Sequence, residues 1–293
     1  MIKTLLLIIA SLTIVCLSAF SSANSFVWKV QQVDKDNTLY LAGTIHLLAA
    51  SDYPLPFVFD KAYEASDSLI FETDLGQQET QAFQQAMLAT LFYRDGNTLD
   101  KVLGAKAWQA FVDWCEQNSL PAEQFLTMKP GLAAITVSLT ELMKLGINQE
   151  GVDSFYYKKG LADKKPFVGL ETIEEQLGFL AGMGGEHPDK LILQTIEEVE
   201  QIPTLFPAVK AAWRSGDAKG LNDLMVKDMK RDYPEVYQSL LLDRNQVWLG
   251  KITEAIKTPE VEFILVGAAH LVGEEGLLAL LKAQGYILTP VSN

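Results

Sequence analysis

Cysteine is almost absent from this 293-residue chain, which contains only Cys16 and Cys115. Cys16 lies in an N-terminal segment that we expect to be removed, so the mature chain would hold one cysteine and no intramolecular disulfide. Its stability must then come from a hydrophobic core, and a chain of about 270 residues buries enough surface for that. We interpret Cys115, on a predicted helix with no histidine near it in sequence, as a small packed side chain rather than a nucleophile.

Basic residues are also scarce. The chain has 24 Lys and Arg against 37 Asp and Glu, a net charge of −13. Removal of the N-terminal segment deletes Lys3 and no acidic residue, which makes the charge −14 (23 basic minus 37 acidic residues). So acidic a protein repels nucleic-acid phosphates and anionic lipid headgroups. We therefore expect no nucleic-acid partner.

A long apolar run occurs only at the N-terminus. A short basic region (Met1-Ile2-Lys3), an apolar region (Leu5–Phe20) and a small-x-small site (Ser21-Ser22-Ala23) follow one another. This order predicts a secretory signal peptide over residues 1–23, cleaved after Ala23. A retained transmembrane anchor is the alternative, but the run is shorter than the usual span of about 20 residues. We expect an exported, periplasmic protein with no membrane anchor after cleavage, and the sequence gives no indication of its oligomeric state.

The remaining chain alternates predicted strands and helices. Phe26–Val33 and Thr38–Thr44 flank a turn-rich tetrapeptide and predict an antiparallel hairpin. Later apolar runs predict strands at Ser68–Thr73, Pro166–Leu170, Glu262–Val266 and Tyr286–Pro290, whereas Gln77–Asp163 and Asp189–Ile256 have helical periodicity almost throughout. We expect a mixed α/β fold in which a central, partly parallel sheet carries an N-terminal hairpin and a large helical insertion or cap. No low-complexity linker divides residues 24–293, so we expect a single domain.

Histidine is rare as well, and two of the three histidines share a position. Gly43-Thr44-Ile45-His46 and Gly267-Ala268-Ala269-His270 each follow an apolar run directly. A glycine at the end of a strand lets the backbone turn or approach a ligand closely. Ligands of open α/β sheets bind outside the carboxyl ends of the strands, so His46 and His270 are expected to converge there. A single histidine of this kind is typical of a structural residue, and the pairing is what favours function. His187, in a loop before Pro188, is interpreted as a surface residue.

Three carboxylates follow strands in the same way. Glu72 lies at the end of the predicted strand Ser68–Thr73 and Asp74 follows that strand directly, and in an extended segment the two side chains point to the same side. Glu72 lies next to the core, where a carboxylate is costly unless it is paired or metal-bound. Asp74 either joins the site or emerges into solvent. Glu171 ends the strand Pro166–Leu170, and we favour a place in the site over simple interaction with the dipole of the following helix.

Other polar positions have structural interpretations when the residues are considered alone. Asp153, before the segment Ser154–Lys159, has the position of a helix N-cap. Arg244 and Asn245 interrupt a helix of regular apolar spacing, where a solvated face is the default.

Several segments together resemble the TraB/PrgY/GumN family, which is related to the TIKI metalloproteases. They cover nearly all of the mature chain in the family's order: Leu41–His46, Leu55-Pro56, Ala65–Asp67, Phe71–Leu75, Gly151–Asp153, Gly169–Thr172, Arg244-Asn245 and Val266–Gly273. The resemblance implies a metal or catalytic centre at His46, Glu72 and His270. It also implies that Arg244 and Asn245 face the same site.

The function implied by the resemblance is a divalent-metal-dependent hydrolase, most consistent with a peptidase, acting on a peptide or small-molecule substrate. Mixed nitrogen and oxygen ligands suit Mn²⁺, Co²⁺, Fe²⁺ or Zn²⁺. Asp74 or Glu171 would then be the proton-transfer base, and Arg244 would stabilise an oxyanion. Two alternatives remain open. One is a metal-independent hydrolase with His46 as general base, as in the distantly related erythromycin esterases, and the other is a non-catalytic protein that binds a peptide, a metal or haem.

Overall fold

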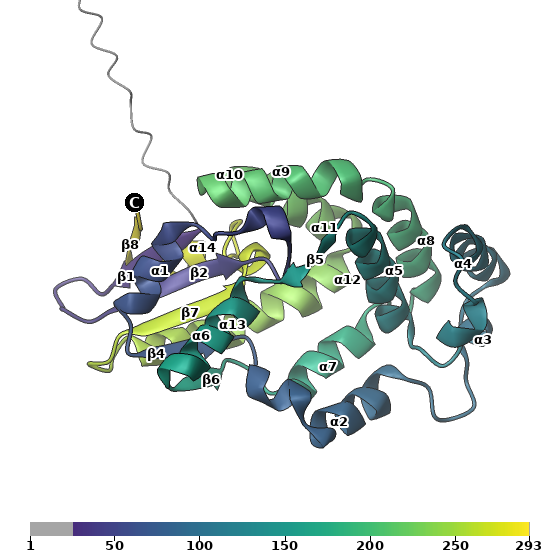
Figure 1. The fold of residues 1–293 in the computed structure, drawn as a ribbon, viewed down its shortest axis with the longest axis horizontal. Helices are drawn as coiled ribbons and strands as arrows, with labels where there is room; N and C mark the ends of the chain where they lie inside the picture. Colours follow the sequence, from purple (N-terminus) through teal and green to yellow (C-terminus); the bar gives the residue numbers. More distant parts are fainter. Residues whose placement is uncertain (1–25, 293) are drawn as a thin grey trace, which may run out of the picture.

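The computed structural model describes residues 26–292, so the predicted signal peptide, residues 1–23, lies outside the described part. A six-stranded sheet occupies one end of the molecule, and helices extend beyond the edge at which its parallel strands finish (Figure 1). The strand order is β6-β4-β7-β2-β1-β8. The strands are β1 (Val27–Gln31), β2 (Thr38–Thr44), β4 (Ser68–Phe71), β6 (Phe167–Gly169), β7 (Glu262–Gly267) and β8 (Ile287–Pro290). Within residues 26–292, no helix combines the length and the apolarity needed to span a membrane.

The sheet is mixed, as the sequence predicts. β6, β4, β7 and β2 are parallel neighbours, whereas β1 pairs antiparallel with both β2 and β8. The central strand β7 is buried from Glu262 to Val266, which explains why its sequence is a continuous apolar run rather than an alternating one. The mixed α/β class, the N-terminal hairpin and the common direction of the four strands are confirmed.

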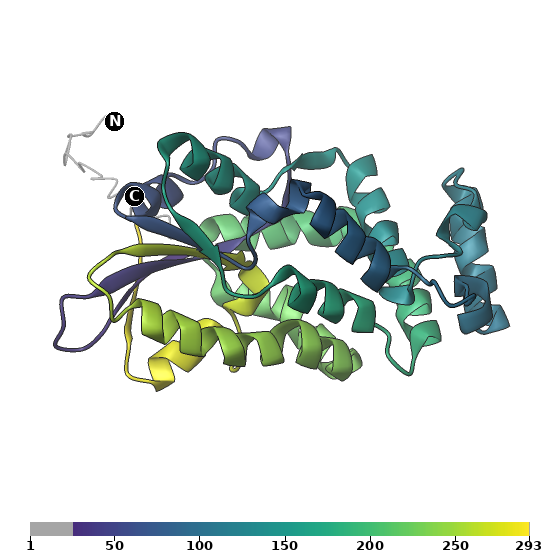
Figure 2. The ribbon, with the colours of Figure 1, turned by 90° about the horizontal axis from the view of Figure 1, so that it is seen from below.

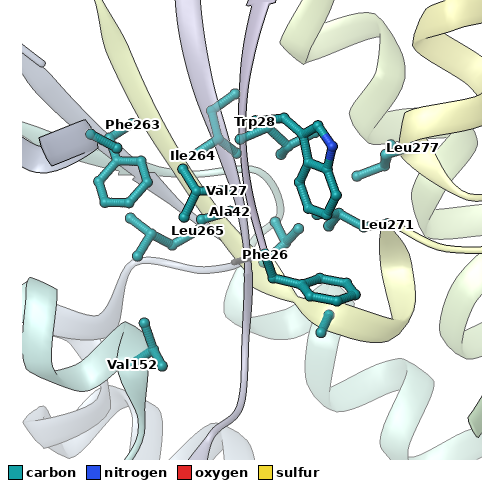
Figure 3. Packing of buried hydrophobic residues seen from close by; sticks show 14 of the residues in the cluster. Phe26, Val27, Trp28, Ala42, Val152, Phe263, Ile264, Leu265, Leu271 and Leu277 are labelled. Atoms are coloured by element: carbon teal, nitrogen blue, oxygen red, sulfur yellow. The ribbon is translucent and has the colours of Figure 1, made fainter. Parts of the chain in front are cut away.

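Helices cover both faces of the sheet (Figure 2). α1 (Phe57–Glu64) and α6 (Val152–Asp163) lie on one face, and α13 (Asp243–Ala255) and α14 (Leu277–Ala283) lie on the other. Successive side chains of a strand point to opposite faces. Figure 3 shows the result: Phe263 and Leu265 lie on the side of Val152, while Trp28 and Leu277 lie on the opposite side.

Most of the remaining helices form the extension, whereas Ala212, Trp213 and Leu221, from two of them, belong to the core cluster of the sheet. The remaining helices are α2 (Gln81–Leu91), α3 (Leu99–Val102), α4 (Ala105–Gln117), α5 (Pro130–Lys144), α7 (Ile173–Gly182), α8 (Pro188–Val199), α9 (Ile202–Ser215), α10 (Ala218–Leu221), α11 (Lys227–Asp232) and α12 (Pro234–Tyr237). α3, α4, α5 and α8 share a separate hydrophobic cluster that contains Phe111, Trp114 and Ile192. Cys115 is fully buried in this cluster, in agreement with its interpretation as a packed side chain.

A second, two-stranded sheet was not predicted. β3 (Leu47–Ala49) pairs antiparallel with β5 (Ile147–Glu150), so the expectation of helix almost throughout Gln77–Asp163 is wrong at β5. The sequence does not show this strand because it is only four residues long and its middle residues, Asn148 and Gln149, are polar and exposed. β3 starts directly after His46, and the pairing therefore brings the start of α6 to that histidine.

Candidate functional site

The carboxyl ends of three parallel strands bring His46, Glu72 and His270 together. β2, β7 and β4 are neighbours in the sheet and finish at the same edge. His46 Nε2 lies 3.9 Å from Glu72 Oε1, and His270 Nε2 lies 4.0 Å from the same oxygen. Residues from opposite ends of the chain thus surround one carboxylate oxygen, as expected from their positions after the strands.

Gly267 lies at the middle of this group. A Cβ atom at this position would lie 3.2 Å from Glu72 Oε1, 3.4 Å from His46 Nε2 and 3.6 Å from His270 Cδ2. The Gly267 N–H donates a hydrogen bond of 2.7 Å to Glu72 Oε1 and fixes the carboxylate. A side chain here would therefore enter the space that the two imidazoles and the carboxylate share.

Asp153 pairs with the ring of His46. Its Oδ1 lies 3.2 Å from His46 Nδ1, which leaves Nε2 directed toward Glu72. α6 can begin against the backbone of His46 only because its N-cap is Gly151, where a Cβ would overlap the carbonyl groups of Ile45 and His46. The interpretation of Asp153 as the N-cap is wrong, because Gly151 holds that position and Asp153 lies in the first turn.

His270 is held in one orientation and one tautomer. Its Nδ1 lies 2.8 Å from Asn245 Oδ1, and the Asn245 amide nitrogen donates to the carbonyl oxygens of His270 and Glu275. Because the amide oxygen can only accept, Nδ1 carries the proton and Nε2 presents its lone pair. Burial lowers the pKa of His270 to about 3, against the opposing attraction of Glu72, so this imidazole is neutral at physiological pH.

Arg244 joins two buried glutamates. Its Nη2 lies 2.5 Å from Glu72 Oε2, and Nε and Nη2 donate to the two carboxylate oxygens of Glu171 at 2.9 and 2.7 Å. Arg244 Nη1 also lies 3.1 Å from His270 Nε2. The interpretation of Arg244 and Asn245 as a solvated face is wrong, because both side chains are buried against the sheet end. Both lie beside His270, where the resemblance to the family leads one to expect them.

The two glutamates differ in their electrostatics. Burial acts to raise the pKa of Glu72, but Arg244, both imidazoles and the Gly267 N–H together lower it to about 2. For Glu171, burial dominates over the attraction of Arg244 and raises the pKa of the carboxyl. Glu72 is thus the firmly ionised carboxylate of the centre.

Asp74 does not join this network. Its Oδ1 accepts the Gly76 N–H at 3.0 Å and its Oδ2 accepts the Gln77 side-chain amide at 3.0 Å, so it caps the 3₁₀ turn Leu75–Glu79. His187 is exposed in its loop, as expected from the sequence.

Trp248 is a site residue that the sequence did not single out. The centroid of its buried ring lies 4.4 Å from the centroid of the His270 ring, and the Arg244 guanidinium carbon lies 4.5 Å from the centroid of the Trp248 ring. Arg244 and Trp248 are four residues apart and share one helical face. That spacing was visible in the sequence, but it pointed equally to ordinary core packing.

The side chains of His46, His270 and Glu72 are of the types that bind divalent cations. Imidazole nitrogens and a carboxylate oxygen are typical ligands, and metal-bound histidines usually have the other ring nitrogen held by an oxygen, as Asp153 and Asn245 do here. The separations of 3.9 and 4.0 Å are just within twice a bond length of about 2.1 Å. Within residues 26–292, no group of three or more His, Cys, Asp or Glu side chains is already arranged to hold an ion. A cation bound to all three would draw in His46, whose side chain is 59% exposed, and would take the His270 lone pair from Arg244.

The contact with Asp153 predicts an unusual titration of His46. Attraction by Asp153 raises the pKa of His46 to about 9, against the lowering effect of partial desolvation. Solvent screens part of this attraction at the exposed ring, so the upward direction is the prediction. The stabilisation from the pair is fully present below the ordinary value of 6.5 and is lost as the pH rises toward the folded value.

NMR titration of the metal-free protein measures this directly, with His46→Gln to assign the resonance. We expect His46 to titrate above 6.5 in the wild type and lower in Asp153→Asn. A wild-type His46 that titrates at or below 6.5 would contradict the Asp153 contact.

Comparisons with known proteins identify the family of the chain. Among curated proteins and among solved structures, none matches the chain. The model of the TraB/PrgY/gumN family matches residues 26–290, nearly the whole described part of the chain, and the chain therefore belongs to the TraB/PrgY/gumN family.

Proposed function

We propose that this protein is an exported, divalent-metal-dependent hydrolase, most consistent with a peptidase. The observation that carries the proposal is the orientation of the two imidazoles. Each has its Nδ1 next to a side-chain oxygen, Asp153 or Asn245, and the two Nε2 atoms lie 3.9 and 4.0 Å from the same oxygen, Glu72 Oε1. Such pre-orientation is typical of ligands around a shared ion and is not needed for core packing.

In this proposal His46, His270 and Glu72 hold the cation, which would be Mn²⁺, Co²⁺, Fe²⁺ or Zn²⁺. When bound, the ion would supply a water of lowered pKa and polarise the scissile carbonyl. The chain supplies the rest. Asn245 and Trp248 fix His270, Asp153 fixes His46, and Arg244 provides a positive charge beside the centre that can stabilise an oxyanion.

The carboxylates outside the ligand set have structural roles in this scheme. Both oxygens of Glu171 accept hydrogen bonds from Arg244, so Glu171 holds that guanidinium in place. Both oxygens of Asp74 are used in its cap. Neither residue is therefore assigned as the proton-transfer base.

A metal-independent hydrolase is the second candidate, and one contact favours it. The Nη1 of Arg244 uses the His270 lone pair that an ion would need, and His46 beside Asp153 has the geometry of a general base. However, a base must be unprotonated, and Asp153 raises the pKa of His46. Binding of a cation would displace the proton from His46. The metal-dependent proposal therefore accounts better for the pairing of His46 with Asp153.

Turnover with and without chelator tests the proposal. Mature protein purified without a metal-binding tag should hydrolyse a member of a broad peptide and ester panel after addition of Mn²⁺, Co²⁺ or Zn²⁺. Chelator should abolish turnover, and Glu72→Gln should abolish it with the circular dichroism spectrum unchanged. Glu262→Gln is the matched control, because Glu262 is also a buried glutamate but begins β7 at the other edge of the sheet.

Two other results of this assay would favour the alternative functions. Turnover that resists chelator would favour the metal-independent hydrolase. No turnover together with tight binding of a peptide or haem, unchanged by Glu72→Gln, would replace the enzyme by a binding protein.

A further inference from the structure

Thr44, the last residue of β2, carries a buried hydroxyl without a partner. The residue is 3% exposed, and its Oγ1 has no hydrogen-bond partner among the described residues. A buried hydroxyl costs free energy unless something satisfies it, so an unpartnered one next to a candidate site requires an explanation.

The register of the sheet places this hydroxyl beside the centre. Thr44 is the partner of Gly267 in the parallel pairing of β2 with β7. Partners in adjacent parallel strands point to the same face, about 4.8 Å apart. A Cβ on Gly267 would lie 3.2 Å from Glu72 Oε1 and 3.4 Å from His46 Nε2. The Thr44 side chain therefore borders the space that Gly267 leaves between the two imidazoles and the carboxylate.

The face of the sheet that carries the Thr44 side chain packs against α6, which also carries Asp153. Phe263, four residues before Gly267 in β7, packs edge-on against Tyr156 of α6, so the side chains of Thr44 and Gly267 face α6. Asp153 lies in the first turn of α6 and contacts His46. Thr44 is thus on the side of the centre where the ring of His46 is held, opposite to α13 with Arg244.

We propose that Thr44 is a further residue of the centre, whose hydroxyl hydrogen-bonds a water or a substrate oxygen in the space beside Gly267. A hydroxyl is suited to this because it can both donate and accept. The inference rests on the proposed function, since it assumes that the centre binds a cation and a hydrolysable substrate.

Thr38 provides a matched control in the same strand. It is the first residue of β2, faces the same side as Thr44, and its Oγ1 is also buried without a partner among the described residues. Six residues of strand, about 20 Å, separate the two. A general effect of removing a buried threonine hydroxyl from β2 should appear in variants of both Thr38 and Thr44. An effect on the centre should appear only in variants of Thr44.

The test compares Thr44→Val, Thr44→Ser and Thr38→Val. Isothermal titration with Mn²⁺ or Zn²⁺ measures ion affinity, and steady-state kinetics on a substrate from the panel measures turnover. Removing groups that support a metal centre without binding the ion typically weakens affinity about ten- to a hundredfold. We expect at least a tenfold loss of ion affinity or of kcat/KM in Thr44→Val, near wild-type values in Thr44→Ser, and none of this loss in Thr38→Val. Because valine has the shape of threonine, both valine variants should melt no lower than the wild type.

The results distinguish a bound water from a substrate oxygen at Thr44, and they test the role of Thr44 separately from the proposed function. Loss of ion affinity would assign a water to Thr44, and loss confined to kcat/KM would assign a substrate oxygen. Wild-type affinity and kinetics in Thr44→Val would overturn the inference and leave the proposed function standing, as would equal losses in the two valine variants. A wild type that binds no ion and turns over no substrate would overturn both. If Thr44→Val does not fold, Thr44→Ala and Thr44→Ser give the same comparison.

Discussion

Replacing Arg244 with methionine should lower the free energy of unfolding by about 3–5 kcal/mol at pH 7. Arg244 is the cation that pairs with both Glu72 and Glu171, whose side chains are 12% and 3% exposed. Methionine fills much of the same volume but leaves both carboxylates without their counter-charge. Chemical denaturation at pH 7 measures the loss.

The free energy of unfolding should depend on pH differently in the two proteins. In the wild type the pKa of Glu72 is lowered from its ordinary value of 4.5 to about 2. The pairing of Glu72 therefore stabilises the fold above pH 4.5, and this stabilisation is lost as the pH falls toward 2. In the variant the unpaired buried carboxylates should have raised pKa values, and their protonation relieves the cost. The gap between the two proteins should therefore narrow as the pH is lowered from about 7 to about 5.

Arg231→Met is the matched control for this prediction. Arg231 also contacts two carboxylates, Asp228 and Asp232, but its side chain is 63% exposed. Exposed pairs of this kind contribute little to stability, because solvent screens the charges. Equal losses in the two variants would show that Arg244 does not compensate buried charge.

Replacing Gly267 with alanine should abolish ion binding and turnover while the fold persists. The new methyl group would lie 3.2 to 3.6 Å from Glu72 Oε1, His46 Nε2 and His270 Cδ2, in the space between them. The backbone angles of Gly267, φ −51° and ψ 135°, are acceptable for alanine, and its N–H can still donate to Glu72. Calorimetric titration with Mn²⁺ or Zn²⁺ and the turnover assay measure the loss.

Gly250→Ala controls for the change from glycine to alanine. Gly250 lies within α13, where a Cβ would meet no atom within 4 Å. Alanine should stabilise that helix by about 0.5–1 kcal/mol and leave ion binding unchanged. Wild-type ion affinity in Gly267→Ala would place the bound ion elsewhere.

The strand ends were predictable from the sequence because each combines two independent signals. An apolar run indicates the buried strand, and the glycine, histidine or glutamate that follows it changes the chemistry at one edge. Parallel strands place such ends together, so the meeting of His46, Glu72 and His270 could be expected from the sequence alone. Arg244 and Asn245 were placed only by the resemblance to the family.

Asp153 and Trp248 were missed because their roles depend on tertiary contacts. Asp153 reaches His46 only because Gly151 allows α6 to begin against the histidine backbone, and the β3–β5 pair brings α6 there. In sequence, Asp153 before a helix is indistinguishable from a cap, and Trp248 in an apolar stripe is indistinguishable from a core residue. Asp74 shows the reverse case, since a carboxylate at a strand end proved to be a cap.

The measurement that tests the cation centre most directly is the shift in melting temperature with Mn²⁺, Co²⁺ or Zn²⁺ in four proteins. An ion that binds only the native state adds RT ln(1 + [L]/Kd), about 2.7 kcal/mol at a hundredfold excess over Kd. We expect a clear rise in the wild type and in His187→Ala, whose histidine is exposed and outside the centre. In His46→Ala and His270→Ala most of the rise should disappear. Equal metal-induced shifts in all four proteins would contradict a cation centre at His46, Glu72 and His270.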